Sequence, residues 1–311
     1  MEKTIKVLSV NISEKKGTIK SPIDSISLTK TGVEKDAHSG PWNRMVSLLG
    51  MESIDKFTID AGRKIAFGEF AENITTEGIK LYKTLPLDRF VNAGLELEVT
   101  QIGKECHGTN CEIFREVGNC VMPKEGIFAR VIRQGQMRAG DELQYKARVI
   151  KSTVITLSDR AFNGVYVDKS GKQIEKRLNE FWNKTGRPSE VDYVLIPDDA
   201  ELLKNAINDA VASGSDFIFT CGGTGISPRD ITPDVVKPML DKELPGIMDL
   251  VRMKYGAEKP AALLSRSIAG VIGQTLVYCL PGSSKAVNEY LDEILKTANH
   301  SLYMIHQLDI H

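Results

Sequence analysis

The sequence has no long hydrophobic run and no excess of charge of either sign. Its 40 lysines and arginines nearly balance 41 aspartates and glutamates, whereas proteins that bind nucleic acid usually carry a basic excess or stripe. No stretch approaches the roughly 20 apolar residues of a membrane span. The first residues, MEKTIKVLSVNISEKKG, alternate between apolar and polar, as in a strand and unlike a secretory signal. We therefore expect a cytoplasmic protein with neither a nucleic-acid nor a membrane partner.

Cysteine is also scarce, with five residues in 311. In a cytosolic protein such cysteines are thiols, metal ligands or catalytic groups more often than disulfides. Cys221 and Cys279 lie inside apolar runs and are expected to be small buried side chains. Cys106, Cys111 and Cys120 fall within fifteen residues of one another and require a separate explanation.

The two halves of the chain differ in hydrophobic pattern, which predicts domains at residues 1–147 and 148–311. The first half contains short runs rich in Val, Ile and Phe between Gly and Pro turns, such as IKVLSVNI and LELEVTQIG. This pattern predicts a mainly β, barrel-like domain with few helices. The second half alternates strand-like runs with helical periodicity, as at Ile174, Leu178 and Phe181. It predicts a three-layer α/β domain with a mostly parallel sheet.

Polar residues follow four predicted strands of the second half. In a parallel sheet the carboxyl ends of strands meet at one edge, where ligands bind. The loops contain Ser158, Asp159 and Arg160; Asp198 and Asp199; Cys221 to Gly225 with Arg229, Asp230 and Thr232; and Pro281, Gly282 and Ser283.

The GGTG segment, Gly222 to Gly225, suits an anion site because glycine exposes backbone N–H groups and tolerates positive φ. Thr232 and Pro233 predict a helix start with Thr232 as N-cap. Two carboxylates, Asp198 and Asp230, fit beside phosphates if Mg²⁺ lies between them. The alternatives are that GGTG is only a tight turn and that Asp198 only caps a helix. Pattern alone therefore predicts an anionic ligand at the strand ends, and no particular reaction.

TCGGTGISPRDITPD resembles the signature of the molybdopterin adenylyltransferases, of the bacterial MogA and MoaB type and of plant and animal fusion proteins such as gephyrin. SDRAFNGVYVDKSG, LIPDD, LPGIMDLVR, LLSRSIAG and YCLPGSS resemble further segments in the family's order. The resemblance spans residues 150–311.

This resemblance implies transfer of AMP from Mg-ATP to molybdopterin with release of pyrophosphate, usually in a homotrimer. It implies that Asp198 and Asp230 are catalytic and bind Mg²⁺. Expected substrate contacts are Ser158, Asp159, Arg160, Asp168, Gly222, Gly223, Thr224, Gly225, Arg229, Thr232, Ser265, Arg266, Pro281, Gly282 and Ser283.

The cysteines of the first half leave three interpretations open. The first is a zinc site formed by Cys106, His107, Cys111 and Cys120, although the spacing lacks a CxxC knuckle. The second is a single reactive thiol, and the third is that the cysteines only fill the core.

The first half resembles a MOSC domain, the module named for the C-terminal part of molybdenum cofactor sulfurases. The similar segments are KDAHSGPWNRMV, GEFAENITTEGI, KECHGTNC and GIFARVIRQGQMRAGD. The resemblance implies binding of the mature molybdenum cofactor or of sulfane sulfur on a cysteine, with Cys111 the better match and Cys106 the second. The expected site residues are Cys111, Cys106, His38, Arg44, Asn73, Thr75 and Arg130.

Three functions follow from these observations. The first is an adenylyltransferase with a second cofactor-handling module, working with other cofactor-synthesis proteins or molybdoenzymes. The second is a non-catalytic molybdopterin carrier or scaffold. The third is a sulfur or molybdenum carrier centred on the MOSC half. The presence of both Asp198 and Asp230 favours the enzyme.

Overall fold

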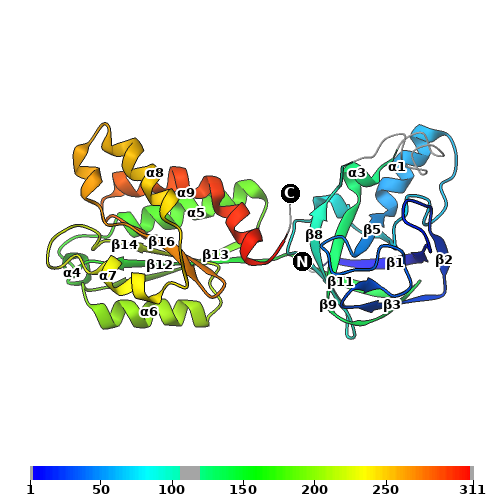
Figure 1. Cartoon of the computed structure of the whole chain (residues 1–311), viewed down its shortest axis with the longest axis horizontal. Helices are drawn as coiled ribbons and strands as arrows, with labels where there is room; N and C mark the ends of the chain where they lie inside the picture. Colours follow the sequence, from blue (N-terminus) through cyan, green and yellow to red (C-terminus); the bar gives the residue numbers. More distant parts are fainter. Residues whose placement is uncertain (1–2, 106–119, 309–311) are drawn as a thin grey trace. The chain divides into compact units, whose positions relative to one another are not determined.

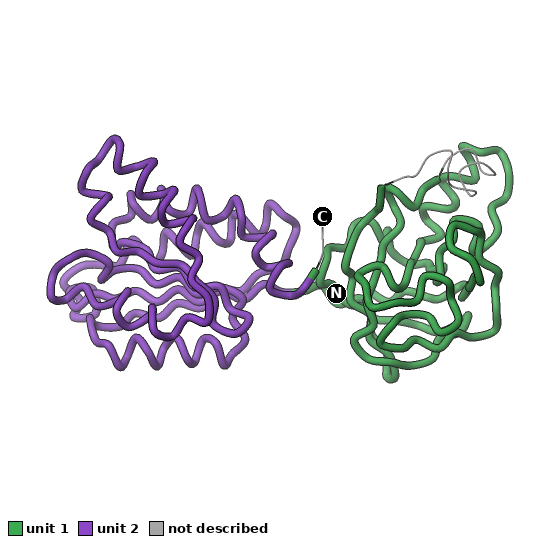
Figure 2. Tube along the Cα trace, in the orientation of Figure 1, with its two compact units in different colours: residues 1–148, 308–311 green, residues 149–307 purple. Residues whose placement is uncertain are grey.

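The computed structural model describes residues 3–105 and 120–308. The chain forms two compact units, residues 1–148 with 308–311 and residues 149–307 (Figure 2). Among the helices of the described residues, none combines the length and apolar character needed to cross a lipid bilayer.

The first unit is a seven-stranded β-barrel, which confirms the predicted fold class. Its strands close in the order β11 (Glu142–Lys146), β7 (Arg89–Val91), β8 (Glu96–Ile102), β9 (Ile127–Arg133), β5 (Val46–Gly50), β6 (Ile74–Glu77) and β1 (Lys3–Ile12), which pairs back with β11. β2 (Ser21–Ile23) extends the sheet beside β1. A separate three-stranded sheet contains β10 (Gly135–Arg138), β3 (Ser25–Thr29) and β4 (Gly32–Val33).

The barrel interior is filled by apolar side chains that alternate along the strands. Ile5, Val7 and Val10 of β1 are fully buried, and the register shifts between Val7 and Ser9. Such a bulge re-aims the following side chains, so the buried positions do not keep a strict period of two.

Helix α1 (Met51–Ala61) is among the few helices of the mainly β first unit, and the hydrophobic pattern had not located it. It buries Ser53, Ile54 and Phe57, and Phe57 packs against Phe70 with ring centroids 5.0 Å apart. Periodicity alone does not identify this helix, because few of its positions are apolar. As in most short helices, its stability comes mainly from tertiary packing. Among the described residues of this unit, the other helical segments are η1 (Leu81–Lys83) and α3 (Met122–Glu125).

The second unit contains a six-stranded sheet in the order β13 (Ser189–Ile196), β12 (Ile150–Leu157), β14 (Phe217–Cys221), β17 (Thr275–Leu280), β16 (Ala269–Ile272) and β15 (Lys242–Glu243). The first four are parallel, and the last two pair antiparallel at one edge. The predicted α/β class is therefore confirmed.

Helices cover both faces of this sheet (Figure 1). α5 (Ser170–Thr185), α8 (Pro245–Gly256) and α9 (Ser284–Ile305) lie on one face, and α6 (Ala200–Ala212) and α7 (Thr232–Val236) lie on the other. The remaining helical segments are α4 (Asp159–Phe162), η3 (Lys237–Met239) and η4 (Pro260–Leu264). Parallel strands covered in this way are buried on both faces, which explains their nearly continuous apolar runs.

Two local predictions can be compared with these helices. Ser283 was expected at the start of the last helix, and its hydroxyl accepts the N–H of Ala286 at 3.2 Å, so it is the N-cap of α9. Phe181 was expected to continue the apolar face of α5 after Ile174 and Leu178. Instead Trp182 is fully buried and Phe181 only half-buried, because Trp182 follows Leu178 by four residues and lies on the same face.

Candidate functional site

The carboxyl ends of β12, β13, β14 and β17 surround a cavity of about 480 Å³. Four loops therefore meet at one sheet edge, as the strand pattern predicted. The lining residues include Ser158, Asp198, Gly222, Gly223, Thr224, Gly225, Arg229, Asp230, Ser265, Pro281, Gly282 and Ser283. All twelve were among the predicted site residues. Leu157, Ile226, Ala261 and Leu264 complete the wall and were not predicted.

The glycine loop requires glycine at two positions. Gly222 has φ of 110°, and a Cβ there would lie 2.4 Å from the carbonyl oxygen of Leu157. Gly223 has φ of 63°, and its Cβ would lie 2.6 Å from the Thr232 hydroxyl. L-residues rarely adopt such φ values, and neither contact leaves room for a side chain. The loop is therefore held against β12 and the start of α7 by close backbone approach.

Thr232 does not act as the predicted N-cap. It is the first residue of α7, whose N-cap is Ile231, and its side chain makes no capping bond. Its hydroxyl instead donates to the Gly222 carbonyl at 2.8 Å, and its backbone N–H donates to the Gly223 carbonyl at 3.0 Å. Pro233 supplies the helix start, as predicted. Thr232 thus fixes the glycine loop from below, and it does not line the cavity.

Arg266 also acts on this loop and does not line the cavity. Its guanidinium donates to the Gly225 carbonyl at 2.7 Å and to the Asp230 carbonyl. It also forms a bidentate pair with Asp234, at 2.8 and 3.0 Å. This planar fork joins the two ends of the segment 225–230, a task that the fixed geometry of arginine suits.

Asp198 and Asp230 approach the cavity from different loops. The Asp230 carboxylate accepts the N–H of Ser227 at 2.7 Å, which closes the turn before it. Asp198 and Asp159 bond reciprocally, since each backbone N–H donates to the other carboxylate, at 3.0 and 3.3 Å. Arg229 lies 3.7 Å from Asp159 with a largely exposed side chain.

Burial raises the pKa of Asp198 above its ordinary value. The neighbouring charges of Asp159 and Asp230 raise this pKa further, while the N–H of Asp159 and the charge of Arg229 oppose them. A cation beside Asp198 would offset the repulsion from these neighbouring carboxylates. The donor set, carboxylate oxygen atoms at the edge of the cavity, fits Mg²⁺.

A second cavity of about 630 Å³ shares Leu157, Ser158, Gly282 and Ser283 with the first. Asp168 lines it, although its carboxylate accepts bonds from Thr156, Tyr193 and the N–H groups at the start of α5. Tyr166, which was not predicted, also lines it and is bonded to the Ser158 hydroxyl at 2.8 Å. Arg160 lies over the Tyr166 ring at 5.2 Å. Asp159 and Arg160 themselves line neither cavity.

In the first unit, three predicted site residues have other partners. Asn73 is buried. Its amide oxygen accepts a hydrogen bond from the Ser47 hydroxyl, and its amide nitrogen donates to the Asn11 carbonyl. Thr75 is buried, and its hydroxyl donates to Glu72 at 2.9 Å. Arg130 pairs with Glu98 on the adjacent strand β8, at 2.6 Å. Asn73 and Arg130 thus join separate segments of the barrel, while the bond of Thr75 is local.

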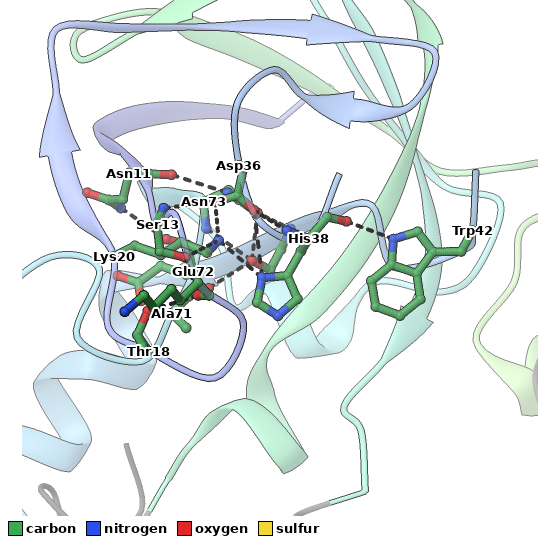
Figure 3. Close-up of polar contacts among 12 residues, drawn as sticks. Asn11, Ser13, Thr18, Lys20, Asp36, His38, Trp42, Ala71, Glu72 and Asn73 are labelled. Atoms are coloured by element: carbon green, nitrogen blue, oxygen red, sulfur yellow. Dashed lines mark hydrogen bonds and ion pairs between the residues drawn. The ribbon is translucent and has the colours of Figure 1, made fainter. Parts of the chain in front are cut away.

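His38 and Arg44 each lie beside the exposed Trp42 (Figure 3 shows His38 and Trp42). The rings of His38 and Trp42 are nearly parallel, at 8°, with centroids 6.5 Å apart. Arg44 lies 5.1 Å from the indole centroid. Beneath His38 is a fully buried ion pair between Lys20 and Asp36. Sequence reasoning did not predict Lys20 or Trp42, because isolated residues in irregular loops carry no periodic signal.

The cysteines lie in different surroundings. Cys106 and Cys111, and also His107, lie outside the described residues. Cys120 is half-buried. Cys221 and Cys279 are buried as expected, and burial raises the pKa of each thiol to about 12. These two are inert core residues, since the thiolate is the reactive form.

Comparison with known proteins identifies both units. The model of the probable molybdopterin binding domain matches residues 153–300, and the MOSC domain model matches residues 35–144. A molybdopterin adenylyltransferase of Helicobacter pylori is 37% identical over 49% of this chain and 85% of its own length. Molybdenum cofactor biosynthesis protein B of Staphylococcus carnosus is 35% identical over 52% of this chain and 92% of its own. Gephyrin of Dictyostelium discoideum is 35% identical over 49% of this chain, which spans only 22% of gephyrin's length.

Proposed function

The chain belongs to the family of molybdenum cofactor biosynthesis proteins with a molybdopterin-binding domain, joined here to a MOSC domain, and from this premise we propose that it adenylates molybdopterin. The reaction class is transfer of AMP from Mg-ATP. An oxygen of the molybdopterin phosphate attacks the α-phosphorus, and the bond from that phosphorus to the bridging oxygen breaks. Pyrophosphate leaves with the bonding electrons.

The observation that carries this proposal is the convergence of Asp198 and Asp230 on the cavity bounded by the glycine loop. No protein nucleophile is required, so catalysis depends on positioning and on charge stabilisation. Asp198 and Asp230 would hold Mg²⁺, which neutralises charge on the phosphates when bound. Thr232 and Arg266 keep the glycine loop in place, and Arg229 supplies a cation at the cavity wall.

The two adjoining cavities fit a reaction between two substrates. They share Ser158, Gly282 and Ser283, so groups bound in each would meet at that boundary. A single-ligand scaffold has no need for the second cavity. This arrangement favours the enzyme over the non-catalytic carrier.

The test is incubation of the full chain with molybdopterin and Mg-ATP. We expect one pyrophosphate released for each molybdopterin adenylated, with both substrates and Mg²⁺ required. Tight molybdopterin binding without pyrophosphate release would instead establish the scaffold function. We also propose that the protein works as a homotrimer through its second unit, with other cofactor-synthesis proteins or molybdoenzymes as partners.

For the first unit we propose handling of the mature cofactor or of sulfane sulfur, supported by the match to the MOSC domain. Cys111 is the proposed thiol, because a thiolate is a soft ligand for molybdenum and can carry sulfur. Cys111→Ser is expected to abolish cofactor binding or sulfur loading with unchanged thermal stability. Cofactor content after purification and the melting temperature measure the two effects.

Cys120→Ser is the matched control for this variant and is expected to retain loading. The competing explanation is a structural metal site formed by Cys106, Cys111 and Cys120. In that case all three serine variants would unfold at similarly lowered temperatures and lose stoichiometric zinc. Such a result would exclude the functional thiol.

A further inference from the structure

Asp159 was an expected substrate contact, yet it lines neither cavity of the second unit. It is the first residue of the short helix α4, and Ser158 alone separates it from β12. Its Oδ1 accepts the backbone N–H of Asp198 at 3.0 Å, and its own N–H donates to Oδ2 of Asp198 at 3.3 Å. These two bonds join the loop after β12 to the loop after β13. Asp159 therefore reaches the cavity only through Asp198, which lines it.

The reciprocal bonds leave one oxygen of each cavity carboxylate without a hydrogen bond. Oδ2 of Asp198 accepts the Asp159 N–H, and no described residue donates to its Oδ1. Asp230 has the same arrangement, because its Oδ2 accepts the Ser227 N–H and its Oδ1 has no donor among the described residues. Each carboxylate is thus held at one oxygen by a backbone N–H, and the other oxygen retains its lone pairs for a cation.

Asp159 is also connected to the segment that carries the second carboxylate. Its Oδ2 lies 3.7 Å from the guanidinium of Arg229, the residue before Asp230. The Arg229 side chain is 79% exposed, and exposed ion pairs contribute little. The hydrogen bond to the Asp198 N–H is therefore the stronger of the two connections. Both oxygens of Asp159 face protein groups, which distinguishes it from Asp198 and Asp230.

We propose that Asp159 is a positioning residue, whose Oδ1 holds the backbone of Asp198 so that the Asp198 carboxylate stays directed to the cavity, where it would bind the divalent cation. The inference rests on the proposed function, because that function supplies the cation. Asp159 itself touches neither the cation nor the substrates. The position of its oxygen is what matters, and its negative charge is secondary.

The first experiment measures binding of Mn²⁺ to the full chain by electron paramagnetic resonance, with and without ATP. Asp159→Ala removes the acceptor and should weaken Mn²⁺ binding by about tenfold or more, the usual effect of removing a group that orients a metal ligand. Asp159→Asn keeps an acceptor oxygen and loses the charge, so it should stay within about threefold of wild type. Wild-type binding in Asp159→Ala, or equal weakening in both variants, would overturn the positioning role.

The second experiment asks whether Asp159 acts through Asp198. Asp198→Asn keeps Asp230 and should retain weak Mn²⁺ binding. Adding Asp159→Ala to this variant should cause no further loss, because two residues that act as one unit are not additive. A further loss of about tenfold, as large as that in the wild-type background, would make Asp159 an independent cation ligand and overturn the proposal.

Asp241→Ala is the matched control. Asp241 is exposed, and its carboxylate accepts the backbone N–H of Gly273 from another segment of the same unit, at 2.7 Å. It lines neither cavity. This variant should lose as much thermal stability as Asp159→Ala and keep wild-type Mn²⁺ binding, whereas equal weakening would reduce Asp159 to a structural role. If Asp159→Ala does not fold, Asp159→Glu decides, since it keeps the charge and displaces the oxygen. Wild-type binding in Asp159→Glu would overturn the proposal.

Pyrophosphate release by the wild type separates this inference from the proposed function. In an active enzyme, Asp159→Ala should lower kcat by about tenfold or more with an unchanged KM for molybdopterin. A wild type that binds Mn²⁺ but releases no pyrophosphate would contradict adenylyl transfer, and the Mn²⁺ binding of the variants would still decide the role of Asp159. A wild type whose Mn²⁺ binding is unaffected by Asp198→Asn would overturn the inference even if pyrophosphate is released.

Discussion

Asp198→Asn and Asp230→Asn should each reduce AMP transfer by at least about a hundredfold, the usual effect of removing one group that stabilises transition-state charge. Molybdopterin affinity should remain within about threefold of wild type, because the proposed role of these carboxylates is to hold the metal and phosphates and not the pterin. Asparagine keeps an oxygen acceptor for the N–H of Ser227 or Asp159, so the loops should keep their conformation. Pyrophosphate release and equilibrium binding of molybdopterin measure the two effects separately.

Asp199→Asn is the matched control for the first of these variants. It removes the same charge from the adjacent residue, whose side chain caps α6 by accepting the N–H of Leu202 at 2.8 Å. Asparagine is an equally good N-cap, so both stability and activity should be preserved. Wild-type turnover in Asp198→Asn or Asp230→Asn would exclude the proposed two-carboxylate site.

Gly223→Val should weaken molybdopterin binding by more than about tenfold, or 1.4 kcal/mol. The substitution places a β-branched residue at a φ of 63°, and its Cβ would begin 2.6 Å from the Thr232 hydroxyl. Relief of that contact requires movement of the loop that lines the cavity. Equilibrium binding and thermal unfolding of the variant measure the two consequences.

Gly214→Val separates backbone strain from the steric effect. Gly214 also has a positive φ, 79°, but open space surrounds its Cβ position. It ends the turn after α6 and does not line the cavity. Both variants should lose about 1–2 kcal/mol of stability from strain, and only Gly223→Val should lose affinity. Unchanged affinity in folded Gly223→Val would remove the loop from the binding site.

Part of the site follows from sequence because parallel strands impose it. Each of these apolar runs in the second half ends in polar residues. Parallel pairing of the strands brings those ends to one edge of the sheet, whichever side chains the strands carry. This reasoning placed Asp198, Gly222 and Asp230 around one cavity, as the structure shows. The same apolar runs predicted burial of Cys221 and Cys279, since a strand covered on both faces is largely removed from solvent.

Other roles depend on contacts between segments that no local pattern specifies. A threonine before a proline is a typical N-cap, yet the Thr232 hydroxyl donates to the carbonyl of Gly222 because the glycine loop packs against the start of α7. Arg130 was a candidate phosphate ligand, and its position opposite Glu98 on the next strand pairs it with that carboxylate. Strand register decides such cross-strand pairs, and register is a property of the assembled barrel.

The sequence by itself determined the two fold classes, the sheet edge that carries the second unit's cavity and the burial of two cysteines, because these depend on hydrophobic periodicity and strand direction. Only the tertiary structure decided that Lys20 meets Asp36 and His38, residues sixteen and eighteen positions away. It also decided that Arg266 clamps a loop that ends 36 residues before it. The physical reason is that a buried charge requires a specific partner at contact distance. The folded loops supply that partner, and no residue pattern predicts their course.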